Sequence, residues 1–242
     1  MDRPGDRALS PSLRAAFGPG ATLPAVEPPA GATPRTALPV RLGVPRHLPA
    51  HLDRLQAGAA ALGRPTAWLD EAAEELTYWL KRHPAQEAAL RLELHLDLRL
   101  LDARLEPLPV ASSPYRLAPM PHPMGNLRAD PLAPHKGLSG PWRHQALSEA
   151  WRRGAEDALL LWPDGTLAES AIATVALERD GRLILPPAGG RVASVTERLD
   201  LAAWAGERGW ALDQAPIPLE ACEGGRLWCL NALRGLWPAA IP

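Results

Sequence analysis

Apolar residues recur at helical spacing in two consecutive stretches near the start of the chain. Residues 47–62 place leucine or alanine at every third or fourth position, and a glycine ends the run. Residues 68–80 repeat the pattern after Thr66, a side chain suited to capping a helix N-terminus, and His83 and Pro84 close it. Because this spacing puts the apolar side chains on one face, the sequence predicts two amphipathic helices.

A strict alternation follows in residues 90–100, where every second position is leucine and the positions between them are charged or histidine. Successive side chains of a strand point to opposite faces, so a period of two is typical of a strand with one buried face. The sequence therefore predicts one half-buried strand here, with His95 on its polar face.

Short apolar runs separated by turn residues mark the second half of the chain. Asp-Gly pairs begin at positions 164 and 180, and this dipeptide is typical of tight turns between strands. Ser194 and Glu197 have the spacing of a capping box at a helix start. The predicted elements are a helix at 142–153, strands at 158–162, 171–177, 183–185 and 227–230, and a helix at 194–209.

Composition divides the chain into four parts. Residues 1–34 are dense in Pro, Gly and Ala without periodicity, so we expect a poorly ordered or irregular arm. Residues 35–106 should form a small α/β domain, and the Pro-rich residues 107–134 an interdomain connection. Residues 135–242 should form a larger domain. The predicted fold class is mixed α/β with two domains.

The overall composition favours a globular protein that acts on a small molecule. Hydrophobic residues make up 46% of the 242 residues, and the formal net charge of -1 provides no basic field for nucleic acid. No uncharged apolar run reaches the ~18 residues of a membrane span, and the start lacks a secretory pattern. Two cysteines match neither a disulfide framework nor a metal pair, so we expect a cytoplasmic protein without a metal site.

Lysine is rare in this chain. Of 26 basic residues only Lys81 and Lys136 are lysines. An arginine replaces a lysine at most surface positions, but an amine that must lose its proton and react with a carbonyl cannot be an arginine. Lys81 stands in the last turn of a predicted helix, where a solvated cation is favourable. The bias toward arginine explains the rarity of lysine, so the count alone assigns no role to Lys136.

The segment HKGLSGPW around Lys136 resembles the lysine segment of the class IV aminotransferases and aminodeoxychorismate lyases. The run WPDGTLAESAIAT contains Glu169, which stands 33 residues after Lys136, a separation similar to that of the family's lysine and glutamate. HLPAHLDRLQAGAAALG resembles the family's H-x-x-R-L helix, and LWCLNALRGLWP its N-S-L-R-G loop. The resemblance covers about residues 36–242. It implies a two-domain fold with pyridoxal 5'-phosphate at the domain interface, and a homodimer.

The resemblance also implies roles for individual residues. Lys136 would bind the cofactor aldehyde covalently and then move protons on an amine substrate. Glu169 would face the pyridine nitrogen and keep it protonated. Arg54 would bind the cofactor phosphate together with Val195 and Thr196, which stand at a predicted helix N-terminus that favours an anion.

Substrate-facing residues are suggested by the same resemblance, although several positions depart from the family pattern. Thr36 ends the stretch GATPRTA, which stands where relatives carry G-D-G-x-F-E-T. Asn231 and Arg234 belong to the C-terminal loop, in which Ala232 replaces a serine. Further departures are Pro141, Thr174 and the helix start Ser194-Val195-Thr196-Glu197, which stands in place of G-I-T-R.

Each assignment has a purely structural alternative. Lys136 would then be a surface lysine and Glu169 a carboxylate at a strand edge. Arg54 would pair with Asp53 or Glu74. Ser194 would only cap its helix, because the S-x-x-E spacing is common without any phosphate.

The short chain is similar in length to aminodeoxychorismate lyases. The resemblance therefore predicts a lyase that converts 4-amino-4-deoxychorismate to 4-aminobenzoate and pyruvate for folate synthesis. One alternative is a class IV aminotransferase that acts on branched-chain or D-amino acids. Another is a degenerate homologue that binds the cofactor without turnover.

Overall fold

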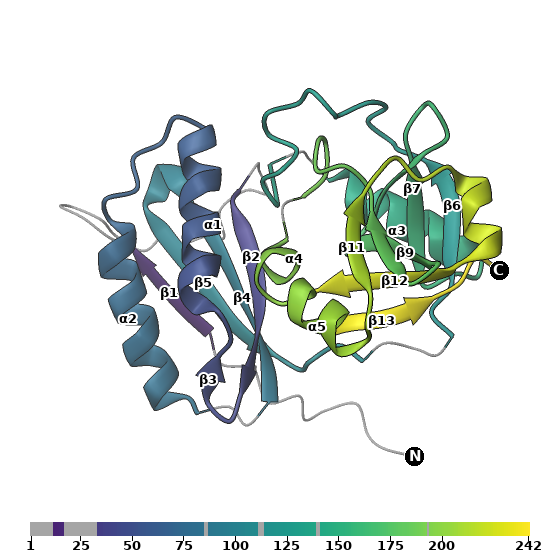
Figure 1. Cartoon of the computed structure of the whole chain (residues 1–242). Coiled ribbons are helices and arrows are strands. Elements are labelled where there is room, and N and C mark those ends of the chain that lie inside the picture. Colours follow the sequence, from purple (N-terminus) through teal and green to yellow (C-terminus); the bar gives the residue numbers. More distant parts are fainter. Residues whose placement is uncertain (1–11, 17–32, 85–86, 111–113, 139–140, 193) are drawn as a thin grey trace, which may run out of the picture. The chain divides into compact units, whose positions relative to one another are not determined.

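The computed structural model describes residues 12–16, 33–84, 87–110, 114–138, 141–192 and 194–242 (Figure 1). It divides into two compact units, Met1–Pro109 and Val110–Pro242. Helices account for 29% and strands for 35% of the structure, which confirms the predicted mixed α/β class.

The first unit is one antiparallel sheet with two helices (Figure 1). The order of its strands is β1-β5-β4-β2-β3. Its described elements are β1 (Ser12–Ala16), β2 (Arg35–Arg41), β3 (Val44–Pro45), α1 (Leu48–Ala61), α2 (Leu69–Arg82), β4 (Glu87–His95), the 3-10 helix η1 (Leu96–Leu98) and β5 (Leu100–Glu106).

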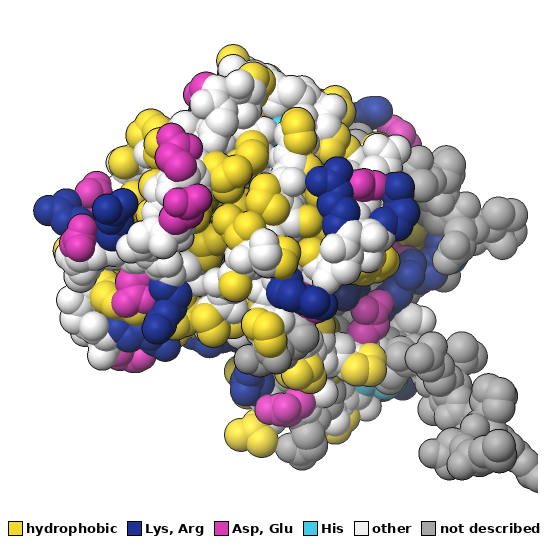
Figure 2. Space-filling model, turned by 90° about the vertical axis from the view of Figure 1, so that its right-hand side faces the viewer, with side chains coloured by type: hydrophobic (Ala, Val, Ile, Leu, Met, Phe, Trp, Pro, Cys, Tyr) yellow, Lys and Arg dark blue, Asp and Glu magenta, His cyan; other side chains and the backbone are white. Residues whose placement is uncertain are grey.

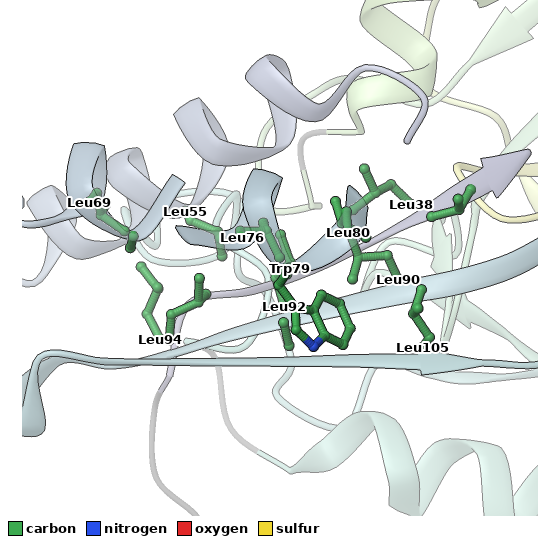
Figure 3. Close-up of a cluster of buried hydrophobic side chains, with 14 of the residues drawn as sticks. Leu38, Leu55, Leu69, Leu76, Trp79, Leu80, Leu90, Leu92, Leu94 and Leu105 are labelled. Atoms are coloured by element: carbon green, nitrogen blue, oxygen red, sulfur yellow. The ribbon is translucent and has the colours of Figure 1, made fainter. Parts of the chain in front are cut away.

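Both helices pack on one face of this sheet, as Figure 3 shows. Leu55 of α1 and Leu76 of α2 are fully buried against sheet residues such as Leu92. The two predicted amphipathic helices are thus confirmed, because their apolar stripes supply this core. The cap prediction is wrong, since Trp68 precedes α2 and no side chain caps that helix start.

The alternating leucines form two strands rather than one. β4 ends at His95, η1 turns the chain, and β5 pairs back on β4 with His95 opposite Leu100. Arg99 takes a left-handed conformation with φ of 46° at this turn. The leucine pattern continues through the turn because Leu96 also packs against the core, so periodicity alone does not reveal the reversal.

The expected N-terminal arm contains a strand. Ser12–Ala16 forms β1, which pairs antiparallel with β5 and places Leu13 against the core of the first unit. The expectation of poor order is therefore wrong for these five residues. Most of the remaining arm lies outside the described residues.

The second unit contains a five-stranded and a three-stranded sheet (Figure 1). The strand orders are β11-β10-β9-β12-β13 and β6-β7-β8. Its described elements are β6 (Leu117–Pro121), α3 (Trp142–Arg152), β7 (Asp157–Leu161), β8 (Leu167–Ser170), β9 (Thr174–Arg179), β10 (Arg182–Leu185), α4 (Val195–Leu199), α5 (Leu201–Glu207), β11 (Ala211–Gln214), η2 (Leu219–Gly224), β12 (Arg226–Asn231) and β13 (Gly235–Ala239).

Alternate residues of single strands build three core clusters in this unit. In β7, Leu160 packs with α3, whereas Leu159 packs with the five-stranded sheet. In β12, Cys229 faces the three-stranded sheet, whereas Trp228 packs with Leu201 of α5. The unit is therefore layered as α3, the small sheet, the large sheet, and α4 with α5.

Three predicted boundaries in this unit change. β6 lies inside the expected connection 107–134, where its prolines are tolerated because it is the edge strand of its sheet. The predicted strand 171–177 begins later than expected, at Thr174 of β9. Residues 171–173 form a turn after β8, in which the Ser170 hydroxyl accepts a hydrogen bond from the Ala173 amide at 2.8 Å. The predicted helix 194–209 is divided at Asp200 into α4 and α5.

The structure confirms the other elements predicted in this unit. They are the helix at 142–153, the strands near 158–162, 183–185 and 227–230, and both Asp-Gly turns.

No described helix is both long and apolar enough to cross a membrane. On the face shown in Figure 2, hydrophobic side chains gather in the middle and charged side chains lie around them.

A buried carboxylate connects the edge of the small sheet to its centre. Asp157 is fully buried and accepts hydrogen bonds from the amides of Ala158 at 2.8 Å and Ala171 at 3.2 Å. Tyr115 donates its hydroxyl to the same carboxylate at 3.3 Å. Burial raises the pKa of Asp157 to about 6, although these donors oppose the shift.

Replacing Leu92 with alanine should destabilise the first unit. Leu92 is 1% exposed in the core, and deleting a buried leucine side chain leaves a cavity that costs about 2–5 kcal/mol. The matched control is Leu98→Ala, because Leu98 is 38% exposed. Urea unfolding followed by circular dichroism measures both variants, and equal midpoints for the two would contradict the core assignment.

Stability should also fall with rising pH because of Asp157. Its pKa in the folded protein is raised above the unfolded value of about 4, so the stabilising contribution is complete below about pH 4 and lost as pH rises through about 6. A shift of about two units corresponds to ~3 kcal/mol. The unfolding free energy of the wild type minus that of Asp157→Asn should fall by about this amount between pH 4 and 7. A pH-independent difference would refute the assignment.

Candidate functional site

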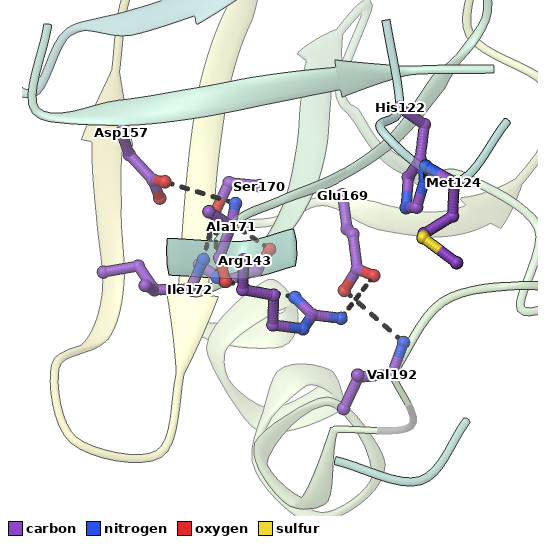
Figure 4. Close-up of polar contacts among 10 residues, drawn as sticks. His122, Met124, Arg143, Asp157, Glu169, Ser170, Ala171, Ile172 and Val192 are labelled. Carbon is purple, nitrogen blue, oxygen red and sulfur yellow. Dashed lines mark hydrogen bonds and ion pairs between the residues drawn. The ribbon is translucent and has the colours of Figure 1, made fainter. Parts of the chain in front are cut away.

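A buried ion pair joins the start of α3 to the end of β8 (Figure 4). Arg143 Nη2 donates to Glu169 Oε1 at 2.7 Å, and the side chains of the two residues are 12% and 4% exposed. The other carboxylate oxygen, Oε2, accepts a longer hydrogen bond of 3.4 Å from the Val192 amide. Glu169 is thus not a solvated carboxylate at a strand edge, and Oε2 is the less strongly bound of its two oxygens.

Arg143 is held from two further directions. Its Nη1 donates to the Ala171 carbonyl at 3.1 Å, and its guanidinium lies 4.2 Å from the ring centroid of Trp142. Three fixed contacts leave this long side chain little rotamer freedom. The guanidinium is therefore preorganised against the glutamate.

His122 follows β6 and contacts the rings of Trp142 and Trp162, with centroid distances of 4.5 and 5.0 Å. Burial, with a smaller contribution from the Arg143 charge, lowers the pKa of His122 to about 4, so the ring is neutral at pH 7. Its Nδ1 accepts a hydrogen bond from the Met124 amide at 3.2 Å, which places the ring proton on Nε2. Neither His122 Nε2 nor Trp142 Nε1 has a hydrogen-bond partner in the described structure, although both are buried.

Lys136 lies half-buried in a series of turns between β6 and α3. Gly137 has φ of 98°, a conformation that other residues rarely adopt, so the turn after the lysine depends on this glycine. Ala133, three residues earlier, is 2% exposed and belongs to the same core cluster as Ala168, the neighbour of Glu169. The lysine segment and the glutamate strand are thus packed on one common core.

The long segment before Lys136 is also fixed by Arg128. The guanidinium of Arg128 binds Asp164 at 2.7 Å and Thr166 at 2.8 Å, and lies 5.2 Å from the ring centroid of Trp162. Gly190 passes so close that a Cβ there would come within 2.7 Å of the Arg128 amide nitrogen. These contacts hold the segment against the β7–β8 turn.

The start of α4 has the expected cap. The Ser194 hydroxyl accepts a hydrogen bond from the Glu197 amide at 3.4 Å, and Val195 and Thr196 follow as the first two helical residues. Amides at these two positions have no acceptor within their own helix. The Glu197 carboxylate binds Arg191 at 2.6 and 2.7 Å instead of returning to the cap. Only the first half of the predicted capping box is therefore formed.

The loop between β12 and β13 is organised by Asn231. Its Oδ1 accepts hydrogen bonds from amides two and three residues later, and its Nδ2 donates to the Ile172 carbonyl at 3.3 Å. Arg234 donates from Nη1 to the Tyr115 hydroxyl at 3.3 Å and lies 5.5 Å from the ring centroids of Tyr115 and Trp237. Asn231 thus connects this loop to the turn three residues beyond Glu169.

Two predicted site residues belong to the first unit. Thr36 lies on β2 and is 3% exposed, and its hydroxyl is 2.6 Å from Nδ1 of the buried His51 on α1. Arg54 is half-buried on the same helix.

Sequence reasoning missed Arg143, His122 and Arg191. A signal existed for Arg143, since it is the second residue of α3, and a cation at a helix N-terminus is unfavourable unless another group compensates it. His122 stands between two prolines, and nothing in that pattern shows that its ring is buried.

The second unit fits the chemistry of pyridoxal phosphate, which presents an aldehyde, a basic ring nitrogen and a phosphate. Lys136 supplies an amine, and the buried Glu169 supplies an acceptor for a protonated ring nitrogen. The buried N–H groups of His122 and Trp142 lack protein acceptors, and such groups are costly unless a ligand binds them. In the described part of the chain, no three His, Cys, Asp or Glu side chains come together in a group able to hold a metal ion.

Comparison with known proteins agrees with these observations. A family model described as amino-transferase class IV matches residues 36–241. A hypothetical aminotransferase from Mycobacterium tuberculosis in its PLP-bound form superposes with a TM-score of 0.79 at 21% identity, over 95% of this chain and 90% of that one. A "Putative 4-amino-4-deoxychorismate lyase" gives 0.74 at 28% identity, over 91% of both chains.

A branched-chain aminotransferase from the archaeon Thermoproteus uzoniensis, with norvaline, gives a TM-score of 0.74 at 17% identity over 87% of this chain and 78% of that one. No curated protein sequence matches the chain. The family model covers most of the chain, and the similar solved structures share its fold. The chain therefore belongs to the class IV aminotransferase family of pyridoxal-phosphate-dependent enzymes.

Proposed function

We propose that this chain is a lyase that converts 4-amino-4-deoxychorismate to 4-aminobenzoate and pyruvate, a step of folate synthesis. The observation that supports the choice is the likeness to the "Putative 4-amino-4-deoxychorismate lyase", with 28% identity over 91% of both chains. Each of the two chains thus covers most of the other.

In this proposal the second unit provides most of the cofactor site. Lys136 would hold the aldehyde, Glu169 would accept a hydrogen bond from the ring nitrogen, and the amides of Val195 and Thr196 would bind the phosphate. The family resemblance makes Arg54 a further candidate ligand of the phosphate. The bound cofactor supplies electron withdrawal from the carbon that carries the substrate amine.

Once the substrate amine has replaced it on the cofactor, the free amine of Lys136 would act as base and acid. It would remove the proton from the substrate carbon that carries the amino group, and the freed electron pair would form a double bond in the six-membered ring of the substrate. The C–O bond to the enolpyruvyl group on the neighbouring carbon breaks, and Lys136 returns the proton to the departing enol, which becomes pyruvate. We place Thr36, Asn231 and Arg234 near the substrate in this proposal.

Two alternatives have specific support. A class IV aminotransferase acting on branched-chain or D-amino acids is suggested by the likeness to the Thermoproteus uzoniensis enzyme. A degenerate homologue that binds the cofactor without turnover is suggested by the stretch GATPRTA, and by the Thr36 hydroxyl, which already contacts His51.

We further propose a cytoplasmic homodimer. Cys222 and Cys229 are both free, which agrees with a reducing compartment.

Borohydride reduction of the holoenzyme should attach the cofactor to Lys136. Reduction makes the link to the amine permanent, so peptide mapping by mass spectrometry should find the added mass on the peptide that contains residue 136. Lys81→Arg, the matched control, should label fully, and Lys136→Arg should not label. Modification of Lys81, or none at all, would disprove the proposed site.

A product assay should separate the lyase from the aminotransferase. With 4-amino-4-deoxychorismate the purified enzyme should release pyruvate and 4-aminobenzoate in equal amounts, and Lys136→Arg should reduce the rate at least a hundredfold, because general acid–base groups typically contribute about 10²–10⁴-fold. Conversion of an amino acid and a 2-oxo acid without pyruvate release would favour the aminotransferase. Labelling of Lys136 without any turnover would favour the degenerate homologue.

A further inference from the structure

We infer that Arg143 is a positioning residue that shares the Glu169 carboxylate with the ring nitrogen of the bound cofactor and thereby weakens protonation of that nitrogen. The inference rests on the proposed function of Lys136 and Glu169. It adds a residue whose effect concerns how strongly the ring withdraws electrons, rather than whether the cofactor binds.

Arg143 makes a shorter hydrogen bond to the Glu169 carboxylate than the Val192 amide does. Its Nη2 lies 2.7 Å from Glu169 Oε1, whereas among the described residues Oε2 accepts a hydrogen bond from the Val192 amide alone, at 3.4 Å. A charged donor at such a distance makes one of the stronger hydrogen bonds in proteins. Oε1 is therefore engaged before any ligand binds, and Oε2 is the oxygen left for the ring nitrogen.

The charge on Glu169 is offset by the same contact. A buried carboxylate without a cation strongly favours a proton on a neighbouring base, because charges interact strongly where water is excluded. With Arg143 attached, the pair carries no net charge, and a protonated ring nitrogen would face the guanidinium as well as the carboxylate. The nitrogen should therefore lose its proton at a lower pH than it would beside an unpaired glutamate.

The other groups described around the Arg143–Glu169 pair do not offset the positive charge of the guanidinium. Trp142 is neutral, Val192 contributes a backbone amide, and Arg143 binds the Ala171 carbonyl, which carries no formal charge. His122 stays neutral near pH 7 because burial lowers its pKa to about 4. In the described structure, the balance at Glu169 is thus set mainly by Arg143.

This balance bears on the reaction. In a transamination, the bound cofactor would have to stabilise the electrons released from the substrate carbon until a proton is delivered elsewhere. In the proposed lyase reaction, the electrons released from the substrate carbon form the double bond that makes the product aromatic. The electrons of the breaking C–O bond leave with the enol oxygen. A ring with a weakly held proton is therefore sufficient for the lyase reaction and less suited to transamination.

The test is a pH titration of holoenzyme carrying cofactor labelled with 15N in the ring, followed by the nitrogen chemical shift. In the wild type the ring nitrogen should lose its proton within about pH 6–9. Arg143→Gln keeps a hydrogen bond to Glu169 but removes the charge, and should raise that midpoint by at least about one pH unit, a tenfold change in proton affinity. Arg143→Lys restores the charge and should titrate closer to the wild type.

Arg116→Met is the matched control, because it removes the exposed pair between Arg116 and Glu156 in the same unit and should leave the midpoint unchanged. A wild-type nitrogen that stays protonated throughout pH 6–9 overturns the inference even if no Arg143 variant folds. Equal midpoints in the wild type and Arg143→Gln also overturn it. Both results are distinguishable from failure of the proposed function, in which borohydride leaves Lys136 unmodified.

Discussion

The candidate site depends on burying a carboxylate beside a guanidinium. An isolated ion inside a protein is costly, and removing one partner of a buried pair leaves the other uncompensated. Here the Arg143–Glu169 pair joins the first turn of α3 to the end of β8, and the Val192 amide brings in the loop before α4. Three segments that are distant in sequence are thus held by one carboxylate. Of the groups assigned to the cofactor, Lys136, Glu169, Val195 and Thr196 come from, or lie next to, these segments.

A second buried arginine neutralises a carboxylate in the first turn of α4. Glu197 stands in the first turn of the helix that we assign to the phosphate, and its charge alone would oppose an anion there. Arg191 is 2% exposed, binds both oxygens of Glu197, and donates from Nε to the carbonyls of Pro186 and Pro187 at 3.2 Å. The altered helix start is therefore close to electrically neutral and remains compatible with a bound phosphate.

Local patterns predicted the elements well but not the points at which the chain reverses. The helix α1 follows from its apolar stripe, whereas the leucines from 90 to 100 continue through a turn and conceal two strands. The break after β8 depends on one hydroxyl, Ser170, whose hydrogen bond to Ala173 is a local choice that periodicity does not encode.

In the candidate site, the resemblance of two segments to the family suggested Lys136 and Glu169. It did not identify the side chain that pairs with Glu169, because that partner is set by tertiary packing. The one local indication of Arg143 was electrostatic, a cation in the first turn of a helix. The burial of His122 had no local signal of this kind.

The cost of these polar groups argues for a ligand. Replacing a buried ion pair by apolar side chains of similar volume is often neutral or stabilising, so folding alone gives little reason for Arg143 and Glu169. The same holds for His122, whose buried Nε2–H lacks an acceptor in the described structure, at a typical cost of about 1–3 kcal/mol. A homologue that had kept only the fold would be more stable with apolar residues at these positions. The polar groups therefore favour a bound cofactor, and they make a purely structural role for Glu169 the weaker explanation.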